Sequence, residues 1–109
     1  MRRGEVWWAQ LPAPAGRRPV VLLSRNEAYV VRELVTVAPI TTRVRRIPTE
    51  VPLDVDDGLP KACVVNLDTL TTIPRRALSR RITALGPDKI SAIEEALRFA
   101  LALGEPGDG

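Results

Sequence analysis

The chain has 109 residues and a formal net charge of +3, and 45% of its residues are hydrophobic. This length is typical of one domain, and the hydrophobic content excludes a wholly disordered chain. No run of about twenty apolar residues is present, which excludes a membrane-spanning helix, and the N-terminus lacks the apolar stretch of a secretory signal. We therefore expect a cytoplasmic protein with one domain over residues 1–104 and a flexible tail over residues 105–109.

Histidine is absent, and this narrows the possible chemistry. Its absence removes the commonest general acid–base, the commonest metal ligand and every catalytic triad that uses an imidazole. The single cysteine, Cys63, allows neither an internal disulfide nor a cysteine zinc site, and its apolar neighbours indicate a buried thiol. No glycine-rich phosphate loop is present. We expect no metal and no cofactor, so an enzyme would use Arg, Thr, Ser, Asp or Glu.

The first three quarters of the chain consist of short strand-like segments separated by turns. The expected strands cover residues 5–11, 18–24, 34–40, 49–53, 62–67, 69–73 and 78–85. Residues 12–16 and 56–60 are rich in turn-forming residues, and Pro52 indicates an edge strand or a bulge. The segment 18–24 is nearly all apolar, as expected for a strand buried on both faces.

The periodicity changes to that of a helix after Gly86. Pro87 at the first helical position and Asp88 in the first turn favour a helix start, and Gly104 with Pro106 favours its end. The apolar residues recur at helical spacing, and we expect most of them to pack on the core and a share to contact a second subunit: Ile90, Ile93, Leu97, Phe99, Leu101 and Leu103. The pattern predicts a mainly β chain with a C-terminal helix, folded as a small curled antiparallel sheet or barrel.

Basic residues gather at the start of one strand and after the end of another. All but Lys61 and Lys89 of the 16 basic residues are arginine, whose planar group binds phosphate at two points. Arg17 and Arg18 lie between a loop and the fixed backbone of Pro19, where a guanidinium is well placed to bind a phosphate and to stabilise its transition state. The alternative is an exposed arginine at a strand end.

The next cluster is Ile40-Thr41-Thr42-Arg43-Val44-Arg45-Arg46. Hydroxyls at a strand end can donate to a phosphate oxygen, and three arginines within four residues give a charge density that drives binding to nucleic acid. A solvated loop after β-favouring threonines is equally compatible with this sequence.

Asn66-Leu67-Asp68-Thr69 forms the third cluster. Its Asn and Asp can contact the edges of unstacked bases, and Asp68 can orient an arginine. An Asx turn that kinks the chain between two strands explains the same residues. We expect the later pairs Arg75-Arg76 and Arg80-Arg81 to add basic surface rather than catalytic groups.

Taken in order, these segments resemble the MazF/PemK/Kid family of toxin endoribonucleases from Arg3 to about Leu103. The resemblance rests on RRGEVWWAQL, then RRPVVLLS after a glycine-containing loop, then VAPITT, VVNLDTLTTI and finally RRITALGPDKISAIEEALRFALAL. No single segment is specific, but their order and spacing are. The resemblance implies an SH3-like barrel and a homodimer that binds single-stranded RNA in a groove across the dimer interface. It also implies a cognate antitoxin, expected to be acidic, whose C-terminal segment blocks the groove.

The resemblance further implies metal-independent cleavage, in which the ribose 2′-hydroxyl attacks the phosphorus and leaves a 2′,3′-cyclic phosphate and a 5′-hydroxyl. It identifies Arg18 and Thr41 as the catalytic residues. RNA-binding or assisting positions are Glu5, Arg17, Thr42, Arg43, Arg45, Asn66 and Asp68; Thr42, Asp68 and Glu5 match functional positions of relatives, and the others belong to the clusters above.

The chain departs from its relatives at the groups that could act as a base. Residues 12–16 contain neither the loop histidine of Kid-like members nor the loop glutamate of others, and Asn66 stands where Kid-like members carry arginine. The resemblance therefore assigns no general base. The alternative function on this fold is that of CcdB-like toxins, which poison DNA gyrase without nuclease activity. A plain SH3-like interaction module would leave the grouping of Arg18, Thr41 and Arg43 unexplained.

Overall fold

The computed structural model describes residues 1–104, in which seven strands precede a C-terminal helix. The predicted tail, residues 105–109, lies outside the described residues. The elements in chain order are β1 (Glu5–Gln10), β2 (Arg17–Leu22), α1 (Ala28–Val31), β3 (Leu34–Thr41), β4 (Glu50–Leu53), η1 (Val55–Asp57), β5 (Cys63–Asn66), β6 (Thr71–Pro74), η2 (Arg75–Ala77), β7 (Leu78–Ala84) and α2 (Pro87–Ala100). All seven predicted strands and the predicted C-terminal helix are present, with boundaries shifted by a few residues.

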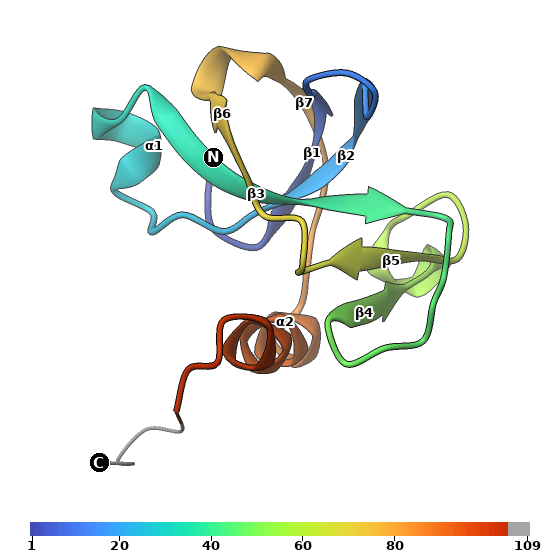
Figure 1. Ribbon diagram of the computed structural model, residues 1–109. Helices are drawn as coiled ribbons and strands as arrows, with labels where there is room; N and C mark the ends of the chain where they lie inside the picture. Colours follow the sequence, from blue (N-terminus) through green and yellow to red (C-terminus); the bar gives the residue numbers. More distant parts are fainter. Residues whose placement is uncertain (105–109) are drawn as a thin grey trace.

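The strands form one antiparallel sheet that curls strongly around β3 (Figure 1). The order is β4-β5-β3-β2-β1-β7, with β6 paired to the first half of β3. The eight-residue β3 therefore pairs with two strands along one edge, with β6 near Leu34 and with β5 near Thr41. β4 lies at the end of this order, so the edge strand that Pro52 indicated is confirmed.

Strand β2 separates two clusters of buried side chains, as its apolar sequence predicted. Val21 belongs to the cluster beneath α2, whereas Val20 and Leu22 belong to the cluster on the other face. Such alternation places successive side chains on opposite faces of a strand. Cys63 is buried in the first cluster, and burial together with the nearby carboxylates of Asp57 and Asp54 raises the pKa of its thiol.

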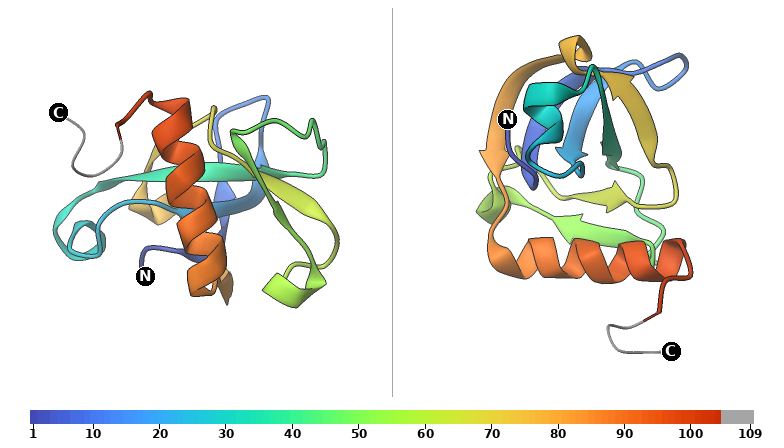
Figure 2. Two further views of the ribbon diagram at one scale, coloured as in Figure 1. Left: turned by 90° about the horizontal axis from the view of Figure 1, so that it is seen from below. Right: turned by 90° about the vertical axis from the view of Figure 1, so that its left-hand side faces the viewer.

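Helix α2 packs along one side of the sheet beside β4 (Figure 2). Ile93 is buried there, and Lys89 Nζ donates to the Pro52 carbonyl at 2.6 Å. At the end of the stripe, Phe99, Leu101 and Leu103 are more than half exposed, so they fall outside the majority expected to pack on the core. Phe99 lines an open groove between α2 and β4 instead of packing into the core.

Residues 28–31 form α1, a single helical turn for which the sequence predicted no element. Four residues are too few to display helical periodicity, and the turn is held from outside by tertiary contacts. Tyr29 is buried against the second cluster, and Arg75 Nη1 donates to its carbonyl at 2.6 Å. Neither α1 nor α2 is long enough and apolar enough to cross a membrane, and no other helix of residues 1–104 is either.

Candidate nucleic-acid interface

A cavity of about 220 Å³ opens between the end of β3, the start of β2 and the strands β4 and β5. Its walls come from the strands β2 to β6 and from three loops, with the lining residues Leu11, Ala15, Arg18, Pro39, Thr41, Arg43, Arg45, Glu50, Asn66, Thr69 and Thr71. Five residues predicted from the sequence therefore meet here, namely Arg18, Thr41, Arg43, Arg45 and Asn66. They lie up to 48 residues apart along the chain, and the curl of the sheet brings them together.

Strand register explains why these side chains share one face. Glu50 pairs with Asn66 across β4 and β5, and Val64 pairs with Thr41 across β5 and β3. Alternate residues of a strand point the same way, so Asn66 and Val64 share a face. Glu50, Asn66 and Thr41 consequently point to the same side of the sheet, away from the cluster beneath α2.

Arg18 reaches this face from β2. Val20 pairs with Pro39, and Arg18 and Thr41 each lie two residues from that pair, on extensions of their strands that face each other. Arg18 Nε donates to the Ala15 carbonyl at 3.2 Å. This bond fixes the plane of the guanidinium group, while its two terminal nitrogens donate to no group of residues 1–104 and remain available for a phosphate.

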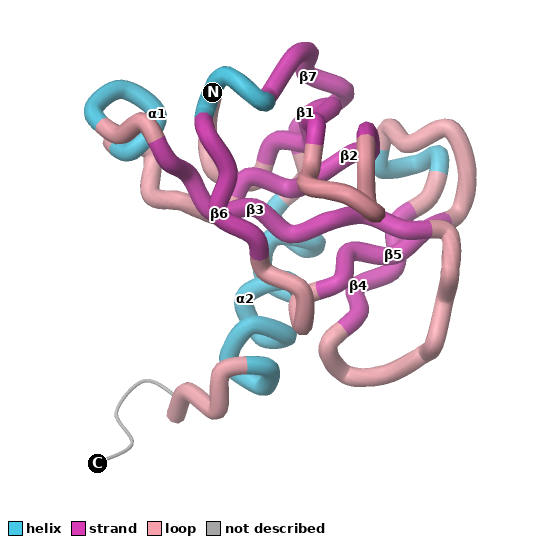
Figure 3. The backbone as a smooth tube through the Cα atoms, turned by 45° about the horizontal axis from the view of Figure 1, so that its top comes forward, coloured by secondary structure: helices cyan, strands magenta, loops and turns pink. Residues whose placement is uncertain are grey.

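Thr41 ends β3 with its hydroxyl directed along the start of the following loop. Its Oγ1 accepts a hydrogen bond from the Arg43 main-chain N–H at 3.1 Å. Because a hydroxyl can accept and donate at once, the proton of Thr41 is free for a phosphate oxygen. The loop from β3 to β4 runs around this end of the molecule (Figure 3), and both Arg43 and Arg45 extend from it along the cavity wall.

The third predicted cluster forms the Asx turn that the sequence allowed. The Asp68 main-chain N–H donates to Asn66 Oδ1 at 2.9 Å, and Asn66 Nδ2 donates to Thr69 Oγ1 at 3.1 Å. One amide hydrogen of Asn66 stays free to contact a base edge. Asp68 does not line the cavity and orients no arginine; its Oδ2 accepts a hydrogen bond from Thr49 Oγ1 at 2.6 Å.

Glu50 is a cavity residue that the sequence reasoning missed. Its Oε1 accepts hydrogen bonds from the main-chain N–H groups of Arg45 at 2.8 Å and Arg46 at 3.0 Å. Arg46 has a φ of 58°, in the left-handed region, so these bonds also hold a strained turn. The alternation of Glu50 with the buried Val51 and Leu53 was visible in the sequence, but the partner strand that gives Glu50 its place was not.

Like Asp68, three more predicted residues lie outside the cavity. Arg17 projects to the opposite face from Arg18, and its guanidinium carbon lies 4.3 Å from the centre of the Trp8 ring. Thr42 is exposed in the loop and does not line the cavity. Glu5 lies on β1 four residues before Ala9, the partner of Arg18, which is roughly 13 Å along a strand.

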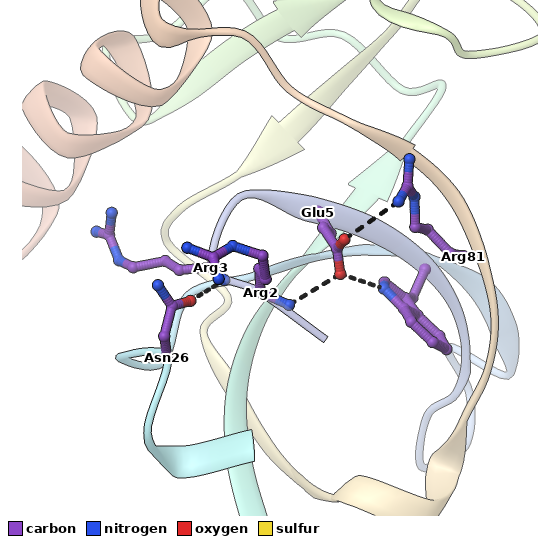
Figure 4. Close-up of polar contacts among 6 residues, drawn as sticks. Arg2, Arg3, Glu5, Asn26 and Arg81 are labelled. Atoms are coloured by element: carbon purple, nitrogen blue, oxygen red, sulfur yellow. Dashed lines mark hydrogen bonds and ion pairs between the residues drawn. The ribbon is translucent and has the colours of Figure 1, made fainter. Parts of the chain in front are cut away.

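Glu5 is instead the centre of a buried polar network (Figure 4). Its Oε1 accepts from the Arg2 main-chain N–H at 2.8 Å and from Trp7 Nε1 at 3.1 Å, and its Oε2 lies 3.4 Å from Arg81 Nη1. Burial raises the pKa of the Glu5 carboxyl, but these hydrogen bonds and the nearby positive charge outweigh burial and lower the pKa below its usual value. The geometry indicates that Glu5 ties the N-terminus to β7.

Comparison with known proteins agrees with this arrangement. Residues 2–101 match the family model described as PemK-like, MazF-like toxin of type II toxin–antitoxin system. A probable endoribonuclease MazF5 of Mycobacterium tuberculosis is 40% identical over 100 residues, covering 91% of each chain. Endoribonuclease MazF3 of the same organism is 43% identical over 86 residues, covering 79% of this chain and 84% of the relative.

Solved structures show the same fold. The Mycobacterium tuberculosis toxin MazF-mt6 matches with a TM-score of 0.86 and 40% identity over 93% of this chain and 99% of that chain. An endoribonuclease in complex with its cognate antitoxin, from a mycobacterial species, matches with a TM-score of 0.86 and 29% identity over 97% of this chain and 99% of that one. The predicted barrel fold with a C-terminal helix is thus confirmed. The chain belongs to the PemK-like, MazF-like toxins of type II toxin–antitoxin systems.

Proposed function

We propose that this chain is the toxin of a type II toxin–antitoxin pair and acts as a sequence-specific endoribonuclease on single-stranded RNA. The observation that carries the proposal is the convergence of Arg18 and Thr41 on one wall of the cavity, each with donors left free. Donors held in place before substrate binds stabilise the charge that develops on a phosphate during cleavage. The named endoribonucleases among the relatives support the same activity.

We propose that cleavage starts from the ribose 2′-hydroxyl and needs no metal. The oxygen O2′ forms a bond to phosphorus while the bond from phosphorus to O5′ breaks, leaving a 2′,3′-cyclic phosphate and a 5′-hydroxyl. Arg18 pairs with the phosphate oxygens that gain charge, and the hydroxyl of Thr41 donates to a non-bridging oxygen. Arg43 and Arg45 neutralise neighbouring phosphates, and the free amide hydrogen of Asn66 contacts a base.

We further propose that the toxin works as a homodimer in the cytoplasm, where its RNA substrate is found. The exposed apolar side chains at the end of α2 support an additional protein contact. The relative solved with its cognate antitoxin supports inhibition by an antitoxin segment, and the arginines at the cavity favour an acidic one. Neither residues 1–104 nor the relatives offer a feature that favours a gyrase poison.

The test is cleavage of a defined pool of single-stranded RNA by purified protein in excess EDTA. We expect cleavage at a short motif, with cyclic phosphate and 5′-hydroxyl ends, and a loss of about 10²–10³-fold in kcat for Arg18→Ala. No cleavage by the wild type would refute the nuclease assignment, and dependence on a divalent ion would refute the metal-free mechanism. Rapid RNA loss after induced expression separates this function from gyrase poisoning, which leaves RNA intact and breaks DNA.

A further inference from the structure

We propose that Glu50 is the general base that removes the proton from the attacking 2′-hydroxyl. This inference rests on the proposed ribonuclease activity and assigns the one role that the resemblance left without a residue. Glu50 comes from the edge strand β4, outside the loop in which relatives carry their histidine or glutamate.

The lining of the cavity contains one carboxylate that can act as a proton acceptor. Guanidinium groups stay protonated, because the pKa of arginine exceeds about 12. The Thr41 hydroxyl and the Asn66 amide are not basic, and Asp68 lies outside the cavity with its Oδ2 bound to Thr49. Among the cavity residues of the described chain, the carboxylate of Glu50 is thus the only base.

The two carboxylate oxygens of Glu50 differ in their hydrogen bonds. Oε1 accepts from the main-chain N–H groups of Arg45 and Arg46, which fixes the carboxylate in place. Oε2 accepts no hydrogen bond from residues 1–104, and no arginine of this part of the chain forms an ion pair with Glu50 within 4.0 Å. A positioned carboxylate with one free oxygen is the arrangement that proton removal requires.

Register places the side chain of Glu50 on the cavity face of the sheet. Glu50, Asn66 and Thr41 share this face, and Arg18 joins them on it from β2. A phosphate held by Arg18 and Thr41 therefore lies on the same face of the sheet as the carboxylate of Glu50. The ribose bonded to this phosphate through O3′ can present its 2′-hydroxyl between the phosphate and Glu50.

The step balances without any further reactant. Glu50 Oε2 takes the proton of the 2′-hydroxyl as the O2′–P bond forms and the P–O5′ bond breaks. The leaving O5′ takes a proton from water, and Glu50 returns its proton to solvent before the next turnover. General base catalysis of this kind typically contributes about 10²–10⁴-fold in rate.

The decisive variant is Glu50→Gln. The amide oxygen of glutamine can still accept from Arg45 and Arg46, so the loop stays anchored while the basic oxygen is lost. We expect kcat on single-stranded RNA to fall about 10²-fold or more, with KM changed less than threefold and the far-UV circular dichroism unchanged. Glu27→Gln is the matched control, because Glu27 is exposed beside α1 and away from both grooves that Glu50 lines, so its loss should leave kcat within twofold.

A pH profile separates a base from a merely structural residue. The charged groups facing Glu50 are Arg18 of β2, Arg43 and Arg45 of the loop, and Glu95 across the second groove. The wild type should gain activity with rising pH on the acidic side of its profile, and Glu50→Gln should lose that dependence. Should Glu50→Gln fold poorly, Glu50→Asp answers the same question, because a shorter carboxylate must keep the acidic limb at a lower rate.

An RNA with sulfur in place of the leaving O5′ distinguishes the base from an acid, since a thiolate leaves without protonation. The defect of Glu50→Gln should persist on this substrate. Rescue of the defect, or a wild-type pH profile in Glu50→Gln, would overturn the assignment of Glu50 while leaving the nuclease function intact. Absence of cleavage by the wild type on either substrate would instead remove the proposed function itself.

Discussion

Neutralising Arg43 and Arg45 together should weaken RNA binding in a way that depends on salt. Both side chains line the cavity and are exposed, while the anchors of their loop are main-chain N–H groups that substitution leaves in place. Each phosphate neutralised on a single strand contributes a slope of about −0.7 to the dependence of log K on log salt. The double variant Arg43→Gln/Arg45→Gln should therefore reduce the slope by about 1.4, which is roughly a sevenfold smaller loss of affinity between about 50 and 200 mM salt.

The assay is titration of a 2′-O-methyl RNA, which cannot react, at several salt concentrations. Arg25→Gln/Arg32→Gln is a matched control, because it removes the same charge from exposed positions flanking α1, at the other end of β3 (Figure 1). An unchanged slope in the cavity variant would refute the placement of phosphates along this wall. An equal reduction in the control would show that net charge, rather than position, governs binding.

The remaining predictions concern one catalytic group and two structural ones. Thr41→Val should lower kcat about 10²-fold in the RNA cleavage assay, whereas Thr41→Ser, which keeps the donor, should stay within tenfold of the wild type. Gly58→Ala should lower the free energy of unfolding by about 2 kcal/mol or more in urea titrations, because Gly58 has a φ of 96° and an added Cβ would collide with Thr83. The lowered pKa of Glu5 contributes stability above its unfolded value of 4.5 that is lost as pH falls through the folded pKa. Glu5→Gln should thus cost about 1–2 kcal/mol of unfolding free energy at pH 7 and progressively less as pH falls below 4.5, and a cost independent of pH would contradict the charged network.

Local sequence patterns were sufficient to locate the seven strands and the C-terminal helix. They did not predict which residues of these elements are buried or which distant segments contact them. Apolar alternation and turn residues located every strand, and Gly86-Pro87 located the start of α2. The exposure of Phe99 was not predictable, because a helical stripe shows which side is apolar and not which of its residues the rest of the chain covers. α1 was missed because its single turn is stabilised by contacts from Arg75, far away in the sequence.

Residues of the candidate site could be predicted where the neighbouring sequence itself indicated a functional position. Arg18 beside a fixed proline and Thr41 at a strand end carry such signals, and the cavity contains both. Glu5 was assigned by the resemblance alone, and its place is set by strand register and by contacts with Trp7 and Arg81. Register depends on pairing between distant segments and cannot be inferred from either segment alone.

The proposed role of Glu50 gives an edge strand the base that the resemblance leaves unassigned. An acid on an edge strand usually faces solvent, and β4 has a partner on one side only. Here the pairing of Glu50 with Asn66 and the curl around β3 turn that exposed face into a cavity wall. The short loop of residues 12–16 positions Arg18 through the Ala15 carbonyl. The carboxylate of Glu50 reaches the cavity from β4, away from this loop. Because β4 is held by β5 and α2 rather than by this loop, the position of Glu50 is independent of the loop's length and composition.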